Sequence, residues 1–166
     1  LITLASVGIV APTLVLANAG DALRLLGQPP WPIEPVRGQI STTRADRLAL
    51  PAVPMAGAGY VLPAMAGRAL FGATAQRHDR DAAVRLADHT ENLAQLERLT
   101  GMAADIDAST LEGRTAWRWS AADRLPVIGG VPDDSMPLVG PGDQPRFVPR
   151  QPGLFVFTAL GSRGIS

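Results

Sequence analysis

Apolar and polar positions alternate along most of the chain and predict a sheet with little helix. Short apolar or alternating runs are bounded by Gly, Pro or charged residues, as strands are. The predicted strands cover residues 33–42, 53–63, 69–74, 113–119 and 154–158. Leucines at helical spacing occur in residues 88–100, just before Gly101. We therefore expect an α+β fold: a mixed, largely antiparallel sheet with one main helix on a face.

The start of the predicted helix carries a capping signal. The segment from Asp88 to Glu91, DHTE, fits the capping box, in which the first side chain caps the first turn and the Glu reaches back. This pattern places the start of the helix near Asp88, and an extension upstream through residues 82–87 is left open. The charged run before it, QRHDRD, is expected to be a solvated loop, and His78 and His89 are both expected on the surface.

The N-terminal segment is apolar, but Thr, Ser, Gly and Pro interrupt it and no basic segment precedes it, so neither a membrane span nor a signal peptide is predicted. It predicts a strand over residues 1–6, a turn at Val7-Gly8, and a buried strand that ends in Asn18, Ala19 and Gly20. A short helix is expected at residues 21–26. The abrupt opening on a strand, without methionine, indicates a fragment of a longer protein.

Composition narrows the function classes. With 166 residues, 46% of them hydrophobic, the chain can bury one good core. Fifteen basic residues balance fifteen acidic ones, so the chain has no net positive charge to attract nucleic acid. Any contact with RNA must therefore come from a local group of basic residues. The absence of cysteine excludes disulfides and thiol chemistry, and two isolated histidines make a poor metal site, so no metal is predicted.

Arg118 is the first candidate for chemistry. It lies in an apolar strand within TAWRWSAADRLPVIGG, where an unpaired arginine is costly to bury, so an anion is expected beside it. A structural ion pair with a carboxylate is the alternative. The spacing of Arg118 to Asp123, Pro126 and the following Ile-Gly resembles the substrate-domain motif of the D-amino-acid oxidase and glycine oxidase superfamily of FAD enzymes. In that family the arginine holds the substrate carboxylate above the flavin.

A longer resemblance covers nearly the whole chain. The segments TLVLANAG, PVRGQIS, AGYVLPA, LFGAT, DHTENL, RLPVIGGVPD and FTALGSRG occur in this order. Together they closely resemble the oxidoreductase half of the bacterial bifunctional tRNA 5-methylaminomethyl-2-thiouridine biosynthesis proteins. The resemblance implies a cytoplasmic FAD enzyme that acts on tRNA. It would oxidise carboxymethylaminomethyl-uridine at the wobble position, release the carboxymethyl group as glyoxylate and leave aminomethyl-uridine.

The resemblance also assigns roles to residues. Arg118 would hold the substrate carboxylate. The residues proposed for the substrate pocket are Arg37, Gln39 and Tyr60. The residues proposed for the flavin edge are Asn18, Ala19, Gly20, Gly161, Ser162, Arg163 and Gly164. A strand-edge salt bridge is the alternative for Arg37, and a core position with its hydroxyl at the rim is the alternative for Tyr60.

One departure from the family sets the expected domain organisation. No Gly-x-Gly-x-x-Gly motif occurs, so the phosphate-binding half of the FAD site is missing, as is the methyltransferase half. We expect residues 1–28 to end an FAD-binding domain, residues 29–158 to form the substrate domain, and residues 159–166 to return to the first. The proline-rich GQPPWPIEP marks the first boundary, and residues 133–152 are expected to be an exposed loop.

Two other functions stay open. A glycine oxidase or D-amino-acid dehydrogenase of the same superfamily would share the arginine motif, but would usually carry a Gly-His-Gly turn in place of residues 161–164. A non-catalytic RNA-binding module is the second alternative, and the small number of aromatic residues disfavours it. The visible absorption of a bound flavin in the full-length protein separates the enzyme from the binding module.

Overall fold

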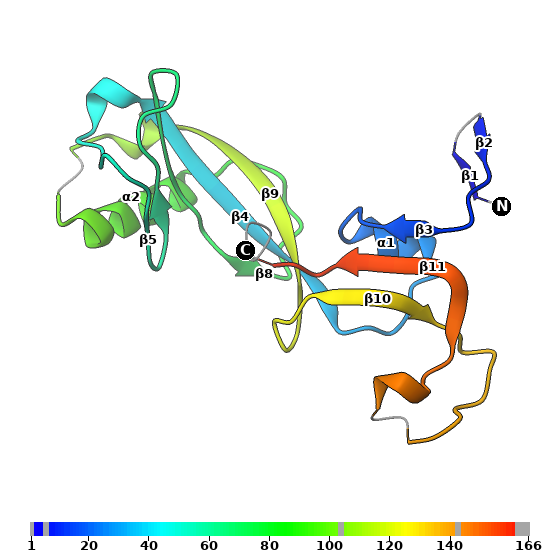
Figure 1. The fold of residues 1–166 in the computed structure, drawn as a ribbon. Helices are drawn as coiled ribbons and strands as arrows, with labels where there is room; N and C mark the ends of the chain where they lie inside the picture. Colours follow the sequence, from blue (N-terminus) through cyan, green and yellow to red (C-terminus); the bar gives the residue numbers. More distant parts are fainter. Residues whose placement is uncertain (1, 5–6, 103–104, 142–143, 162–166) are drawn as a thin grey trace. The chain divides into compact units, whose positions relative to one another are not determined.

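The computed structural model describes residues 2–4, 7–102, 105–141 and 144–161 (Figure 1). The helices and strands are β1 Ile2–Leu4, β2 Val7–Ile9, β3 Leu14–Leu16, α1 Asp21–Leu25, β4 Ile33–Arg44, β5 Met55–Ala56, β6 Tyr60–Val61, β7 Arg68–Gly72, β8 Gln76–Arg77, α2 Leu86–Thr100, β9 Glu112–Ala121, β10 Val127–Pro132 and β11 Arg150–Thr158. Short 3-10 helices are η1 Ala45–Arg47, η2 Ala108–Thr110 and η3 Pro145–Phe147. This sheet-dominated architecture confirms the predicted α+β class.

The chain forms two compact units. The terminal unit consists of Leu1–Glu34 and Trp119–Ser166, and the central unit of Pro35–Arg118. The chain passes from one unit to the other within β4 and again within β9. The boundaries inferred from the sequence lie near residues 28 and 158 instead, and in the structure residues 119–158 group with the N-terminal segment.

A sheet of strand order β5-β6-β7-β4-β8, with β9 also paired to β4, forms the central unit. β4 pairs antiparallel with β7 and β8, and β6 pairs antiparallel with β5 and β7. Every second residue of β4 from Pro35 to Thr43 is buried, which is the alternation of a sheet with one covered face. Helix α2 covers this face, and Val61, Phe71, Leu96 and Leu111 form the core there. We call it the helix face and the opposite one the far face.

Helix α2 begins earlier than its sequence signal suggests. It starts at Leu86 after Arg85 and has no side-chain cap, so the predicted capping box at Asp88 is wrong. Asp88 instead lies inside the first turn, where it is buried and paired with Arg37. The other end agrees with the prediction, because Gly101 ends the helix in the left-handed conformation at φ 70°.

The terminal unit contains a sheet of order β10-β11-β3. β3 runs parallel to β11, and β10 runs antiparallel to it. Leu16, Ala22, Val131 and Val156 form its core on the side of α1. Only one face of β11 is buried, since Phe155 and Phe157 are 41% and 39% exposed.

At the N-terminus, β1 pairs with β2, so the predicted turn at Val7-Gly8 is wrong because both residues belong to a strand. The short helix expected next is present as α1. None of the described helices is long and apolar enough to cross a membrane.

Candidate functional site

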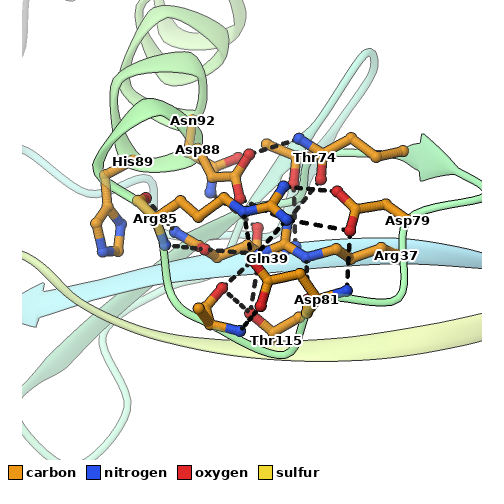
Figure 2. A network of polar contacts seen from close by, with 12 residues as sticks. Arg37, Gln39, Thr74, Asp79, Asp81, Arg85, Asp88, His89, Asn92 and Thr115 are labelled. Carbon is orange, nitrogen blue, oxygen red and sulfur yellow. Dashed lines mark hydrogen bonds and ion pairs between the residues drawn. The ribbon is translucent and has the colours of Figure 1, made fainter.

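Arg37 lies at the centre of a buried polar network on the helix face (Figure 2). Nη1 forms an ion pair with Asp88 Oδ2 at 2.6 Å and donates to Gln76 Oε1 at 2.5 Å. Nε donates to the carbonyl of Asp81 at 2.7 Å, and Nη2 to the carbonyl of Ala83 at 2.6 Å. Arg37 therefore has the structural ion pair that the sequence left open as the alternative to a pocket role.

Gln39 is the next buried residue of β4 and belongs to the same network. Its Nε2 donates to the carbonyl of Arg85 at 2.9 Å, and its Oε1 accepts from the Arg85 amide at 2.8 Å. Its backbone amide donates to Thr74 Oγ1 at 3.0 Å, and its carbonyl accepts from the Thr74 amide at 3.2 Å. Hydrogen bonds from Gln39 therefore connect β4 to the loops that contain Thr74 and Arg85, and its side-chain amide and backbone groups all have protein partners.

The charged segment before α2 is docked against the fold, so the prediction of a solvated loop is wrong for part of it. Arg85 forms ion pairs with Asp79 at 2.5 Å and Asp81 at 2.8 Å. The hydrogen bonds from Arg85 are the main reason why the pKa of Asp79 is lowered to about 2. The Asp79 carbonyl accepts a hydrogen bond from Trp117 Nε1 at 2.8 Å, which fixes the segment to β9.

His89 is buried rather than solvated, which corrects the sequence prediction, whereas His78 is exposed as predicted. The His89 Nδ1 atom lies 2.7 Å from Ser41 Oγ. Gly113 leaves room for the ring, since a Cβ there would lie 2.7 Å from His89 Cε1. Burial lowers the pKa of His89 below its ordinary value. Sequence alone missed this position because the histidine pairs with a residue 48 positions away.

Arg118 lies on the far face of the same sheet. Thr115, three residues earlier on β9, lies on the helix face, because its Oγ1 is 3.4 Å from Arg37 Nη2. Strand residues three apart point to opposite faces, so Arg118 points to the far face. The guanidinium of Arg118 lies over Gly38 of β4: a Cβ at Gly38 would be 3.5 Å from Arg118 Nη2 and 3.0 Å from the Thr74 carbonyl. Because Gly38 has no side chain, the Arg118 guanidinium and the Thr74 carbonyl can both approach β4 closely there.

Tyr60 shares the far face. It lies opposite Gly72 in the β6–β7 pair, next to Val61, which is fully buried on the helix face. The alternation of the strand therefore directs the partly exposed Tyr60 to the side of Arg118. Of the four proposed pocket residues, Arg118 and Tyr60 share one face, while Arg37 and Gln39 lie on the other.

The described members of the proposed flavin edge, Asn18, Ala19, Gly20 and Gly161, lie in the terminal unit, after the carboxyl ends of its two parallel strands. Ala19 follows β3, and Ala159 and Gly161 follow β11, with φ angles of 54°, 57° and 57°. Thr158 Oγ1 donates to the Ala19 carbonyl at 2.8 Å and ties the two strand ends together. Ligands of open sheets with parallel strands bind at this edge, and strained left-handed residues gather at such sites.

Trp119 supports both turns, a role that the sequence analysis did not assign to it. A Cβ on Gly20 would lie 1.9 Å from the Trp119 indole, so only glycine fits beneath the ring. The Gly161 amide donates to the Trp119 carbonyl at 2.8 Å. Asn18 donates from Nδ2 to Asp21 Oδ2 at 3.3 Å. Ser162, Arg163 and Gly164, which complete the predicted turn, lie outside the described residues.

The motif that follows Arg118 in sequence lines a cleft of about 330 Å³ in the terminal unit. Asp123 and Pro126 lie on its wall with Trp31, and Arg150 and Val156 complete it. Asp123 Oδ1 accepts a hydrogen bond from the Leu125 amide at 2.9 Å and so shapes the turn into β10.

Among the described residues, no three His, Cys, Asp or Glu side chains gather closely enough to hold a metal ion.

Comparison with known proteins agrees with these features. The family profile described as DAO, FAD dependent oxidoreductase, matches residues 3–166. The chain is 52% identical to the tRNA 5-methylaminomethyl-2-thiouridine biosynthesis bifunctional protein MnmC of Methylibium petroleiphilum, over 94% of the chain and 26% of that protein. It is 44% identical to MnmC of Burkholderia multivorans, over 93% of the chain and 24% of that protein. The chain thus spans about a quarter of the length of these relatives.

Among solved structures, glycine oxidase from Geobacillus kaustophilus matches with a TM-score of 0.64 and 22% identity, over 92% of this chain and 37% of that chain. Iminodiacetate oxidase from Chelativorans matches with a TM-score of 0.60 and 20% identity, over 92% of this chain and 38% of that one. At this identity, the likeness concerns the fold.

Proposed function

Because the chain belongs to the DAO family of FAD-dependent oxidoreductases, we propose that it is part of an enzyme that oxidises the carboxymethylaminomethyl group of a tRNA wobble uridine. The products would be aminomethyl-uridine and glyoxylate. The observation that carries the proposal is an arginine on the far face of the central sheet, in a chain 52% identical to an MnmC protein. The enzyme would work in the cytoplasm with the rest of its own polypeptide and with tRNA as partners.

The described residues fit one edge of the cofactor. When bound, FAD supplies a two-electron oxidant for the carbon between the amine and the carboxylate. The carboxyl ends of β3 and β11 offer closely approachable backbone at Ala19 and Gly161. The pyrophosphate loop of such sites, Gly-x-Gly-x-x-Gly, does not occur in the 166 residues. Asn18, Ala19, Gly20 and Gly161 to Gly164 are therefore proposed for the flavin-ring edge alone.

Arg118 is proposed to hold the carboxylate of the substrate. A guanidinium grips a carboxylate through two parallel N–H donors and so fixes the adjacent methylene in one orientation. Tyr60, on the same face, is proposed as part of the pocket. Loss of a hydride from the methylene to the two-electron oxidant, together with loss of the amine N–H proton, converts the amine to an imine. One water molecule then hydrolyses the imine to aminomethyl-uridine and glyoxylate. Positioning of this kind accounts for a large share of the reduction in barrier.

The test is Arg118→Lys in the full-length protein. Lysine keeps the charge but loses the two-point grip, so kcat/KM should fall by about ten- to a hundredfold, the scale of a charge-assisted hydrogen bond. The flavin content should stay unchanged. A substrate analogue without the carboxylate should react equally with both proteins. If Arg118 is only structural, the melting temperature will fall instead, while kcat/KM per folded molecule stays the same.

A glycine or D-amino-acid oxidase activity is the second candidate, since the fold resembles that of glycine oxidase. Such an enzyme needs the same carboxylate grip but no contact with RNA. Assaying the full-length protein with glycine, with D-amino acids and with modified tRNA separates the two. Turnover of free amino acids without turnover of tRNA would reject the proposed substrate.

A further inference from the structure

Arg118 is one of several arginines on the far face of the central sheet. Arg114 lies four residues earlier on β9, and the alternation of the strand puts it on the same face. Arg68 of β7 donates to Thr42 Oγ1 at 2.9 Å, and its cross-strand neighbour is Arg44 of β4. Both lie beside Thr42, whose position in β4 is on the far face. We call Arg44, Arg68, Arg114 and Arg118 the arginine row.

The members of the row differ in their surroundings. Arg68 forms an ion pair with Glu112 at 2.8 Å, and Arg44 forms one with Asp46 at 2.6 Å. All four of these side chains are 42% to 75% exposed, so solvent screens the two pairs and each contributes little to stability. Arg114 is exposed and has no ion pair or side-chain hydrogen bond within the part of the chain that the structure describes. Its charge is therefore available to a ligand.

Two arginines on one face suit a nucleotide. Residues four apart on a strand are separated by about 13 Å at 3.3 Å per residue. A uridine in tRNA that carries a carboxymethylaminomethyl arm presents two kinds of anion, the carboxylate of the arm and the backbone phosphates. A free amino acid has one anionic group and would use Arg118 alone. A second cation on the same face is therefore a feature that a polynucleotide substrate can use and an amino acid cannot.

We propose that Arg114 binds a backbone phosphate of the tRNA whose modified uridine is held by Arg118, and that Arg68 and Arg44 extend this contact along the strand. The inference rests on the proposed function, and it assigns part of the RNA-binding surface to the central unit. Phosphate contacts of this kind set position and affinity but carry no base specificity. They also make binding dependent on salt, because each one releases condensed counterions.

The test uses the full-length enzyme and the Arg114→Gln variant. Kd for modified tRNA is measured at several salt concentrations, and kcat/KM is measured for tRNA and for the free carboxymethylaminomethyl-uridine nucleoside. We expect tRNA affinity at low salt to fall about fivefold, and the slope of log Kd against log salt to shrink by about 0.7, the value for one phosphate of a single strand. Turnover of the nucleoside should not change, because it has no phosphate.

Two control variants accompany Arg114→Gln. Arg98→Gln makes the same charge change in the last turn of α2, on the other side of the sheet, and should leave the salt slope unchanged. Glu112→Gln removes the carboxylate paired with Arg68 and should tighten tRNA binding. A gain in affinity is an effect that damage to the fold does not produce.

Three results would overturn the proposal: an unchanged salt slope for Arg114→Gln, an equal loss for Arg98→Gln, or an equal loss of turnover on the nucleoside. Failure of the proposed function looks different, since the unaltered enzyme would then act on neither tRNA nor the nucleoside.

Discussion

Two adjacent residues of β4 have different roles because they point to opposite faces of the sheet. Arg37 and Gly38 are neighbours, yet Arg37 points into the network under α2 while Gly38 faces the guanidinium of Arg118. Arg37 is fully buried among groups that accept its hydrogen bonds or pair with its charge. Arg118 lies over the backbone of Gly38. The glycine therefore matters to the proposed carboxylate grip through the space that it leaves.

Substitutions of Gly38 can test this role in the full-length enzyme. In Gly38→Ala the added Cβ meets Arg118 Nη2 at 3.5 Å, an ordinary contact, whereas the γ-carbons of Gly38→Val extend into the space of the guanidinium. We expect Gly38→Val to lower kcat/KM by about tenfold more than Gly38→Ala. Both variants approach the Thr74 carbonyl equally closely, at 3.0 Å, so any loss of stability from that contact is shared. Equal kcat/KM values for the two variants would contradict the prediction.

At the scale of elements, the pair of Arg37 and Asp88 joins β4 to α2. Both side chains are almost completely buried. Asp88→Asn would leave the arginine charge buried without its partner, which costs about 3–5 kcal/mol. Asp46→Asn, which breaks the exposed pair with Arg44, should change the stability far less, because solvent screens that pair. Urea unfolding of both variants measures the difference, and similar midpoints for the two would show that the buried pair is not needed.

The contact between α2 and β4 also predicts a pH dependence. The pKa of His89 is lowered in the fold by burial, and the nearby charge of Asp88 opposes this only in part. The unfolded chain therefore binds the proton more tightly, and the contribution of His89 to stability is present above about pH 6.5 and is lost as the pH falls below it. The melting temperature should drop between about pH 7 and pH 5, and His89→Gln should reduce that drop. Asp79 does not interfere, because its lowered pKa acts below about pH 4.

Across the chain, each of the two units carries its own set of proposed residues. The central unit carries Arg118 and the arginine row, and the terminal unit carries the turns after β3 and β11. Neither contains a Gly-x-Gly-x-x-Gly loop. The curated relatives are about four times as long as the matched region. The chain therefore carries residues proposed for the substrate in one unit and residues proposed for one edge of the cofactor in the other.

The 166-residue chain alone should bind FAD weakly, with no submicromolar affinity, because it lacks the loop that binds the pyrophosphate. Titration with FAD, followed by flavin fluorescence, measures this, with the full-length protein as the positive control. Submicromolar binding by the chain alone would mean that the turns near Ala19 and Gly161 hold the cofactor without that loop.

Local patterns in the sequence were enough to identify the family, the α+β class, strands β4 and β9, and the end of α2. These depend on local spacing: alternation for the strands, leucines at helical intervals for α2, and an ordered series of motifs for the family. The spacing of the arginine motif was also sufficient to single out Arg118 as the candidate for the substrate carboxylate. The glycine at position 101 was a sufficient signal for the end of α2.

The folded structure was needed to show which face of the sheet each strand residue occupies and which charges are paired. Alternation predicts that Arg37 and Arg118 each point to the opposite face of the sheet from the residues next to them in the sequence. It does not show which of the two faces α2 covers. The start of α2 was predicted near Asp88 because aspartate is a common N-cap residue. In the structure Asp88 pairs with Arg37, which is 51 residues away in the sequence. His89 was misjudged for the same reason, since Ser41 lies on another element. Burial and pairing depend on contacts between distant segments, and a local pattern carries no information about them.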